Sequence, residues 1–168
     1  MSTQLTFRPL ESTDLDAVHA LNQAAVPAVG SVSLAQMREL NAMATHFLLA
    51  HHDDTLAGFI ILLAPGARYA SVNYQWFSAR YARFLYVDRI VVDPAFQRRG
   101  IASAFYARAW RDAQTRAVAL TCEVNVIPPN PQSMAFHTQF GFSEVGRQHN
   151  DGGAKLVSML VREPCVTR

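Results

Sequence analysis

Residues 93–103 read Asp93-Pro94-Ala95-Phe96-Gln97-Arg98-Arg99-Gly100-Ile101-Ala102-Ser103. This stretch follows an apolar run, Phe84 to Val92, that predicts a β-strand, and it precedes a helical pattern of apolar residues from Ala102 to Ala113. A turn that enters a helix presents unpaired backbone N–H groups at the positive end of the helix dipole. With Gly100 to relax the backbone and the pair Arg98-Arg99 to add positive charge, the stretch predicts an anion site suited to phosphate. The alternative is an ordinary strand–helix turn with a solvated basic pair.

The chain around this stretch alternates between strand and helix patterns. Short apolar runs predict strands, and apolar residues at helical spacing predict helices. The expected strands are 5–8, 46–51, 56–64, 84–92, 118–126, 142–148 and 155–161. The expected helices are 15–25, 34–40, 102–113 and 132–139. This order predicts a mixed α/β fold with helices packed on a sheet, and the length of 168 residues fits a single domain, 1–168.

Composition and charge narrow the class of protein. Half of the residues are hydrophobic, 17% are charged and the formal net charge is +2, which is typical of a soluble globular protein and too small to predict nucleic-acid binding. Cys122 and Cys165 lie far apart without the spacing of a metal site, so we expect no metal and a reducing compartment. The first residues lack the apolar stretch of a secretory leader, and the longest apolar run, Phe59 to Ala64, is too short to cross a bilayer. A cytoplasmic protein without a membrane segment is expected.

A second motif follows later in the chain. It reads Asn130-Pro131-Gln132-Ser133-Met134-Ala135-Phe136-His137-Thr138-Gln139-Phe140-Gly141-Phe142. It resembles the Asn-X-X-Ala-X-X-Leu-Tyr-X-X-X-Gly-Phe motif of the Gcn5-related N-acetyltransferase (GNAT) superfamily, and Gln97 to Ala102 resembles that family's Gln/Arg-X-X-Gly-X-Gly/Ala motif. The opening, Thr6 to Pro9 before an Asp-Leu-Asp helix, is also similar. Two motifs in the family's order and separation are far more specific than either one alone.

The resemblance implies a fold and a cofactor. The fold is a mixed, mostly antiparallel sheet of about seven strands, with helices on both faces and a splayed parallel strand pair at the cofactor site. The cofactor is acetyl-CoA, with backbone groups of residues 90–92 pairing with its pantetheine arm and N–H groups from Arg98 to Ser103 holding its pyrophosphate. The expected cofactor-binding residues are Ile90, Val91, Val92, Gln97, Arg98, Arg99, Gly100, Ile101, Ala102, Ser103, Asn130, Ser133 and His137. For Ser133 the alternative is a hydroxyl that only starts its helix.

Acetyl transfer to an amine requires deprotonation of the ammonium, stabilisation of a tetrahedral oxyanion and departure of a thiolate. A lysine amine, with a pKa of about 10.4, costs about 4.6 kcal/mol to deprotonate at pH 7, whereas an α-amine, with a pKa of about 8, costs about 1.4 kcal/mol. A base therefore matters more for a lysine amine than for an α-amine. A thiol has a pKa of about 8.5, so an acid assists the departure without being obligatory. The resemblance implies the N–H of Val92 as the oxyanion donor.

His137 stands where the second motif has tyrosine, which in many family members is proposed to protonate the departing thiolate. Histidine can also give a proton near neutral pH, so His137 is a candidate general acid. Two alternatives stay open. His137 either orients the thioester or the acceptor by hydrogen bonding, or packs within its helix without a role.

Two carboxylates are candidates for the general base. Glu123 lies among apolar neighbours of an expected strand, and ribosomal-protein N-terminal acetyltransferases of the superfamily carry a base in a similar Glu-Val pair. That match requires two extra residues in the following Pro-Pro loop; otherwise Asn125, which cannot be a base, takes the position. Asp88 on the preceding strand is the other candidate. The alternatives are a structural ion pair for either carboxylate and a water chain in place of a single base.

The acceptor is left open as a small-molecule amine, an amino acid or a protein N-terminus. Residues 26–33 and the aromatic stretch 69–81 are the segments expected to select it, although the rings could instead pack on the core from a covering loop or short helix. A second class of function is a non-catalytic acyl-CoA binding module, because the motif's tyrosine is missing. A phosphate-binding regulatory domain would need the second motif to be accidental. Dimers are frequent in the superfamily, so a homodimer is also left open.

Overall fold

The computed structural model describes residues 4–165, which group into two compact units. The first unit contains the described residues up to Leu63 together with Val87–Arg108. The second contains Ala64–Tyr86 together with the described residues from Ala109 onward. The strand β4 (Phe84–Val92) therefore contributes residues 84–86 to the second unit and residues 87–92 to the first.

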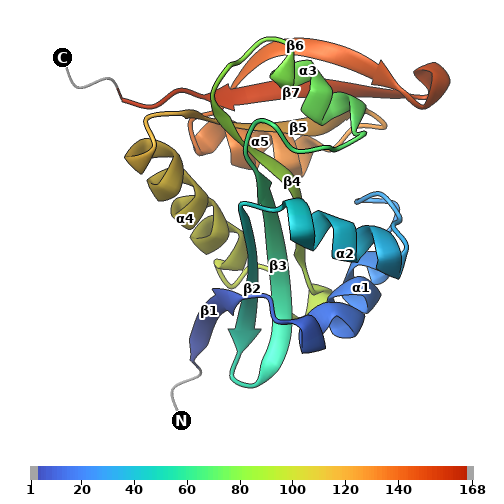
Figure 1. The fold of residues 1–168 in the computed structure, drawn as a ribbon, viewed down its shortest axis with the longest axis vertical. Helices are drawn as coiled ribbons and strands as arrows, with labels where there is room; N and C mark the ends of the chain where they lie inside the picture. The colour runs from blue at the N-terminus through green and yellow to red at the C-terminus, as the bar shows by residue number, and fades with distance from the viewer. Residues whose placement is uncertain (1–3, 166–168) are drawn as a thin grey trace. The chain divides into compact units, whose positions relative to one another are not determined.

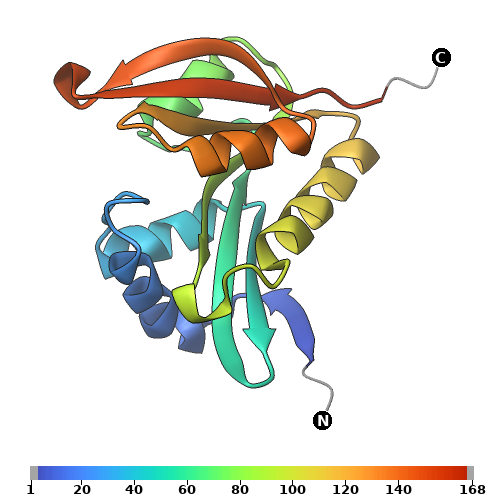
Figure 2. The same cartoon turned by 180° about the vertical axis from the view of Figure 1, so that it is seen from behind.

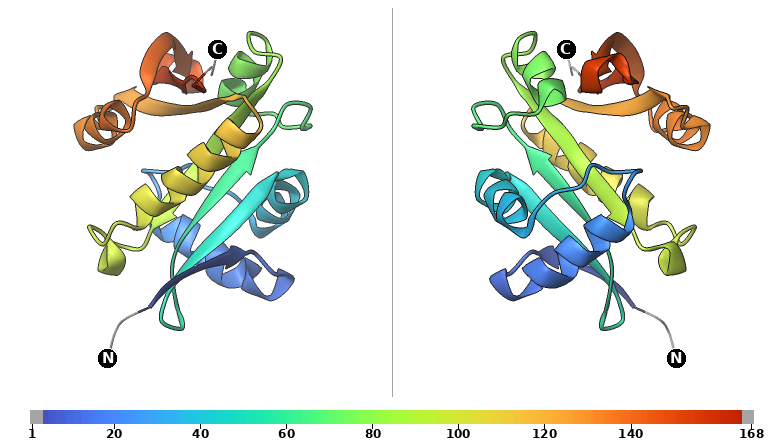
Figure 3. Two further views of the ribbon diagram at one scale, coloured as in Figure 1. Left: turned by 90° about the vertical axis from the view of Figure 1, so that its left-hand side faces the viewer. Right: turned by 90° about the vertical axis from the view of Figure 1, so that its right-hand side faces the viewer.

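The first unit has strands covered by helices on both faces. Its elements are β1 (Leu5–Pro9), α1 (Leu15–Ala24), α2 (Leu34–Met43), β2 (His46–His52), β3 (Thr55–Leu63), the end of β4 and the start of α4 (Ile101–Thr115). Figure 1 and Figure 3 show α1 and α2 on one face of β2 and β3 and the start of α4 on the other face. Apolar side chains from all of these layers meet in a core that excludes water. Fully buried members are Val18, Met37, Leu49, Phe59 and Phe105.

The second unit is built around the antiparallel pairs β5–β7 and β7–β6. Its elements are α3 (Val72–Ser78), the start of β4, the end of α4, β5 (Ala119–Ile127), α5 (Pro131–Gln139), β6 (Ser143–Asn150) and β7 (Lys155–Arg162). The helices α3 and α5 lie on opposite faces of these strands (Figure 2). Helix α3 approaches β6 closely, because a Cβ on Gly146 would lie 2.6 Å from the Trp76 ring.

Across the described residues, seven strands form a sheet in the order β1-β2-β3-β4-β5-β7-β6. β4 and β5 pair in parallel through Phe84–Ala119, Leu85–Leu120 and Tyr86–Thr121. The pairs β1–β2 and β2–β3 are antiparallel, as are β5–β7 and β6–β7. This confirms the mixed, mostly antiparallel sheet expected from the sequence. Within residues 4–165, no helix has both the length and the apolar character needed to cross a bilayer.

Candidate active site

The turn between β4 and α4 uses the conformational freedom that the sequence predicted for Gly100, and it also contains a left-handed residue that was not predicted, Arg98. The Asp93 carboxylate accepts from the N–H of Ala95 at 2.8 Å, which starts a short 3-10 turn over Pro94–Phe96. Arg98 and Gly100 then take left-handed conformations, with φ of 59° and 77°. The chain enters α4 directly after Gly100, whose carbonyl accepts the helical hydrogen bond from Ala104 at 2.9 Å. The first N–H groups of α4 therefore belong to a helix start that follows a left-handed turn.

The space in front of this turn fits a phosphate group. A Cβ built on Gly100 would meet no heavy atom within 4 Å, and residues 97–100 include the exposed side chains of Gln97, Arg98 and Arg99. An open surface over helical N–H groups, next to two guanidinium groups, attracts anions. The residues present therefore fit the pyrophosphate of the cofactor that the sequence implied.

Arg99 is held by the tip of the β2–β3 hairpin. Its Nη1 atom lies 3.2 Å from Nε2 of His52, and its guanidinium carbon lies 5.5 Å from the centre of the Phe96 ring. The His52 ring also packs beside Phe96, with 5.2 Å between ring centres. A guanidinium can only donate, so Nε2 of His52 accepts in this contact. His52 follows the expected strand 46–51, and its contact with Arg99 was not predicted.

The end of β4 packs closely on β3. The N–H of Asp93 donates to the carbonyl of Ala57 at 2.9 Å. A Cβ on Gly58 would lie 2.5 Å from the carbonyl oxygen of Val91, so only glycine allows this approach. Val91 is buried, whereas Ile90 and Val92 are half-buried. The pairing of residues 90–92 with a pantetheine arm stays a prediction.

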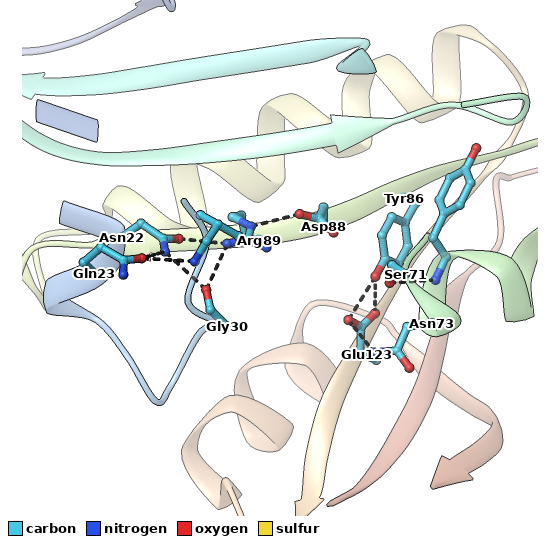
Figure 4. A network of polar contacts seen from close by, with 11 residues as sticks. Asn22, Gln23, Gly30, Ser71, Asn73, Tyr86, Asp88, Arg89 and Glu123 are labelled. Carbon is cyan, nitrogen blue, oxygen red and sulfur yellow. Dashed lines mark hydrogen bonds and ion pairs between the residues drawn. The ribbon is translucent and has the colours of Figure 1, made fainter. Parts of the chain in front are cut away.

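Asp88 and Arg89 form a buried ion pair on β4, with side chains 4% and 9% exposed and 2.9 Å between Asp88 Oδ2 and Arg89 Nε. Arg89 Nη1 also donates to Asn22 Oδ1 at 2.9 Å and to the Gly30 carbonyl at 3.1 Å (Figure 4). Arg89 therefore connects β4 to α1 through Asn22 and to the loop 26–33 through the Gly30 carbonyl. Among the roles left open for Asp88, the structural ion pair is the one that the structure contains.

Glu123 on β5 lies in a second cluster, within the second unit. The Tyr86 hydroxyl lies 2.9 Å from Glu123 Oε1 and 2.8 Å from Oε2, and Asn73 Nδ2 donates to Oε1 at 3.1 Å (Figure 4). Asn73 Oδ1 in turn accepts from Gln148 Nε2 and Asn150 Nδ2, each at 3.0 Å. Tyr86 and Asn73 are neutral donors, and they hold the carboxylate at a defined position. The sequence singled out Glu123, but not Tyr86 or Asn73.

Asn130 and Ser133 organise the start of α5. Asn130 Oδ1 accepts from the N–H of Ser133 at 3.1 Å, as a helix N-cap does. The Ser133 hydroxyl lies 3.4 Å from Nδ1 of His137. Both side chains thus have local hydrogen bonds that stabilise the helix, and their contact with the cofactor stays a prediction.

His137 is buried in α5, with 6% of its surface exposed. The Phe136 and Phe142 rings each lie 5.3 Å from its ring, and Nδ1 lies 2.7 Å from the Ser133 carbonyl oxygen. Burial lowers the pKa of His137 below 6.5, because an imidazolium loses hydration there, and the bond to Ser133 opposes this effect less strongly. A carbonyl only accepts, so Nδ1 carries the proton of the neutral ring.

The aromatic stretch is partly core. Tyr74 and Phe77 of α3 are buried, and the Tyr74 hydroxyl donates to the Ala64 carbonyl at 2.6 Å. Tyr69 is half-buried, with its ring centre 5.8 Å from that of Tyr74. A shallow surface pocket beside these rings is lined by Gly66, Ala67, Arg68, Tyr69, Ala70, Tyr74, Gln75 and Ser78. The rings therefore pack on the core as one reading expected, and a role in acceptor selection stays a prediction.

The candidate residues divide between the two units. Asp88, residues 90–92 and the turn 97–103 belong to the first unit. Glu123, Asn130, Ser133 and His137 belong to the second. The turn 97–103 has an open helix start that fits a phosphate group, and the Glu123 carboxylate is hydrogen-bonded by Tyr86 and Asn73.

Comparison with known proteins defines the class. The model of the acetyltransferase (GNAT) family matches residues 15–142. The chain therefore belongs to the GNAT family of acetyltransferases, whose cofactor is acetyl-CoA. No curated protein sequence matches it significantly.

Solved structures share the fold at low sequence identity. The ribosomal-protein-S18-alanine N-acetyltransferase of Escherichia coli is 19% identical, with a TM-score of 0.75 over 98% of this chain and 97% of that chain. NAA60 of Arabidopsis thaliana, solved in complex with acetyl-CoA, is 18% identical, with a TM-score of 0.75 over 95% and 99%. Ard1 of Thermoplasma volcanium is 16% identical, with a TM-score of 0.75 over 95% and 97%. At these identities the likeness establishes the fold.

Proposed function

We propose that the protein is an N-acetyltransferase that moves the acetyl group of acetyl-CoA to a primary amine by direct attack in a ternary complex. The acceptor is a small-molecule amine, an amino acid or a protein N-terminus. The observation that carries the proposal is the Glu123 carboxylate, held by Tyr86 and Asn73 on a chain of the GNAT family. A base is what acetyl transfer to an ammonium group requires of the protein.

The residues divide the work as follows. Acetyl-CoA, when bound, supplies an activated acetyl thioester. The turn from Gln97 to Ser103 binds the phosphates through N–H groups and through Arg98 and Arg99. Glu123 accepts the proton of the acceptor ammonium, directly or through a water molecule, while Tyr86 holds the carboxylate in place. The N–H of Val92 serves as the oxyanion donor.

His137 acts in this scheme as a neutral hydrogen-bonding group. Its pKa is lowered by burial, so the imidazolium is the minor form at neutral pH. With the proton of the neutral ring on Nδ1, Nε2 is an acceptor and cannot give a proton to a thiolate. This supports the orienting role over the acid role. The acid role of His137 is the alternative.

The test of the base is Glu123→Gln, which preserves shape and removes basicity. We expect turnover of an accepted amine to fall about 10²-fold or more while acetyl-CoA affinity is retained. Glu39→Gln, on the exposed side of α2, is the matched control and should leave turnover unchanged. Equal turnover in both variants would remove Glu123 from the mechanism.

A non-catalytic acyl-CoA binding module is the alternative function, favoured by the histidine at the motif's tyrosine position. Thiol release from acetyl-CoA in the presence of an amine library, with the acetylated product identified by mass spectrometry, distinguishes the two. Acetyl-CoA binding without turnover on any amine would favour the module.

Three further expectations remain proposals. A single domain is supported by the family match, which spans residues of both compact units. The cytoplasmic location and the homodimer rest on the sequence analysis. Fractionation of the cell and sedimentation of the purified protein test them.

A further inference from the structure

We propose that Asn73 is a positioning residue for Glu123 that ties the carboxylate to the β6–β7 hairpin; this inference rests on the base role proposed for Glu123. Asn73 lies on α3, between the strand that carries Glu123 and the hairpin that carries Gln148 and Asn150. Its side-chain amide forms hydrogen bonds with Glu123 and with the hairpin. The contacts span 50 positions of sequence to Glu123 and 75 to Gln148.

The chemistry of the groups fixes the direction of every bond in this chain. An ionised carboxylate only accepts, so the Asn73 amide must face Glu123 with its NH₂ group. Asn73 Oδ1 then faces the hairpin and needs donors there. Gln148 and Asn150 each present an NH₂ group at 3.0 Å. Hydrogen-bond donation therefore runs from the hairpin to Asn73 and from Asn73 to Glu123. This arrangement requires that Glu123 act as the acceptor toward Asn73.

Tyr86 completes the support from the other side. Its hydroxyl contacts both carboxylate oxygens, whereas Asn73 contacts Oε1 alone. Tyr86 is a titratable group that bonds Glu123, and the β7 residue in register with Glu123 is the uncharged Met159. Two donors from different elements set the position and the plane of the carboxylate. A base must be held in this way to meet a substrate proton at hydrogen-bond distance.

At the hairpin end of this hydrogen-bond network, one buried polar atom lacks a partner among the described residues. Asn150 Oδ1 is buried without a hydrogen-bond partner among the described residues, while its NH₂ group is directed at Asn73. A buried acceptor without a donor destabilises a fold, and such groups in native structures call for an explanation. Delivery of the Asn150 NH₂ group to Asn73 accounts for this orientation. Trp76 of α3 also packs closely on Gly146 of β6, which is a second contact between the helix and the hairpin.

The test is Asn73→Asp, an isosteric change that replaces the donor facing Glu123 by an acceptor. Two adjacent carboxylates cannot both ionise easily, so the acid limb of kcat/KM should move up by about one pH unit or more. Asn41→Asp, the same substitution at an exposed site of α2, is the matched control and should leave the limb in place. Asn73→Ala, which removes the amide without adding charge, should lower kcat about 10-fold with acetyl-CoA affinity unchanged.

A second readout does not need turnover. The titration of the Glu123 carboxyl carbon, followed by NMR in the protein without cofactor, should move to higher pH in Asn73→Asp and stay in place in Asn41→Asp. If Glu123→Gln is inactive but Asn73→Asp leaves both the titration and the acid limb unchanged, the positioning role is wrong and the proposed base stands. If Glu123→Gln is fully active, the base proposal fails, and Asn73 loses its role with it.

Discussion

The hydroxyl of Tyr86 on β4 lies within hydrogen-bond distance of both carboxylate oxygens of Glu123 on β5, at 2.9 and 2.8 Å. The two strands are parallel neighbours in this region, with Tyr86 in register with Thr121, two residues before Glu123. Tyr86 is fully buried, so its hydroxyl depends on a partner inside the protein. The hydrogen bonds between Tyr86 and Glu123 are therefore part of the buried structure of the second unit.

Tyr86→Phe should weaken this hold without changing the shape of the core. Because the carboxylate keeps the Asn73 contact, we expect a fall in kcat of about 10-fold rather than complete loss. Tyr106→Phe, which removes a hydroxyl from another buried tyrosine, serves as the control for packing. Steady-state kinetics on both proteins decide the matter. Identical kcat values would show that the Tyr86 hydroxyl does not support the base.

Gly100→Glu should abolish acetyl-CoA binding in a folded protein. The left-handed φ of 77° disfavours any side chain, and the carboxylate would occupy the open space over the turn and repel phosphate. Gly152→Glu is the matched control, because that residue has φ of 65° and equally open surroundings in the β6–β7 turn. Calorimetry with acetyl-CoA measures the effect. Unchanged affinity in Gly100→Glu would contradict the phosphate assignment.

Arg98→Ala combined with Arg99→Ala should weaken acetyl-CoA more than acetyl-pantetheine, which lacks the nucleotide phosphates. Charge-assisted hydrogen bonds form only with the phosphate-bearing ligand. Arg38→Ala combined with Arg111→Ala removes two exposed arginines elsewhere and should leave both affinities unchanged. Equal losses for the two ligands in the first double variant would show that these arginines do not contact the phosphates.

The pH dependence of turnover distinguishes the roles of His137. A general acid must be protonated, and the pKa of His137 is lowered from 6.5, so an acid role would confine high activity to lower pH. We expect instead that turnover shows no decline between about pH 7 and pH 8 that depends on His137. His137→Ala should lower turnover, and His137→Tyr should restore part of it through a phenol hydroxyl. A basic limb near or below 6.5 that is lost in His137→Tyr would establish the acid role.

The same residue makes stability depend on pH. Since the folded-state pKa lies below 6.5, the unfolded chain binds more protons as the pH falls through this range. Stability from the neutral, buried ring is therefore present above 6.5 and is lost as the pH falls through the folded-state pKa. The Tm of the wild type should fall more between pH 7.5 and pH 5.5 than the Tm of His137→Phe, by about one to a few degrees. His149→Phe, at an exposed position, should behave like the wild type.

The turn from Gln97 to Ser103 and the order of the main elements were predictable because their signals are local. Gly100 and its neighbours form a strand–turn–helix in which each conformation follows from adjacent residues. The same holds for β6 and β7, which were expected as strands 142–148 and 155–161. The family resemblance joined these local signals into one fold.

The surroundings of Glu123 were not predictable, because its partners are far away in sequence. Asn73 lies in a stretch that was read for its aromatic residues, and its amide role depends on Gln148, 75 positions later. Tyr86 was read as a strand residue among apolar neighbours. A hydroxyl in a buried strand needs a polar partner, and that was the available signal. A structural ion pair was one of the roles predicted for Asp88, and Asp88 forms this pair with Arg89.

The contact between Trp76 and Gly146 has an evolutionary consequence. A Cβ at position 146 would lie 2.6 Å from the indole ring, so a larger residue there requires the Trp76 side chain to shift or to be replaced. Related sequences should therefore vary at these two positions together: a smaller residue at 76 releases position 146 from glycine.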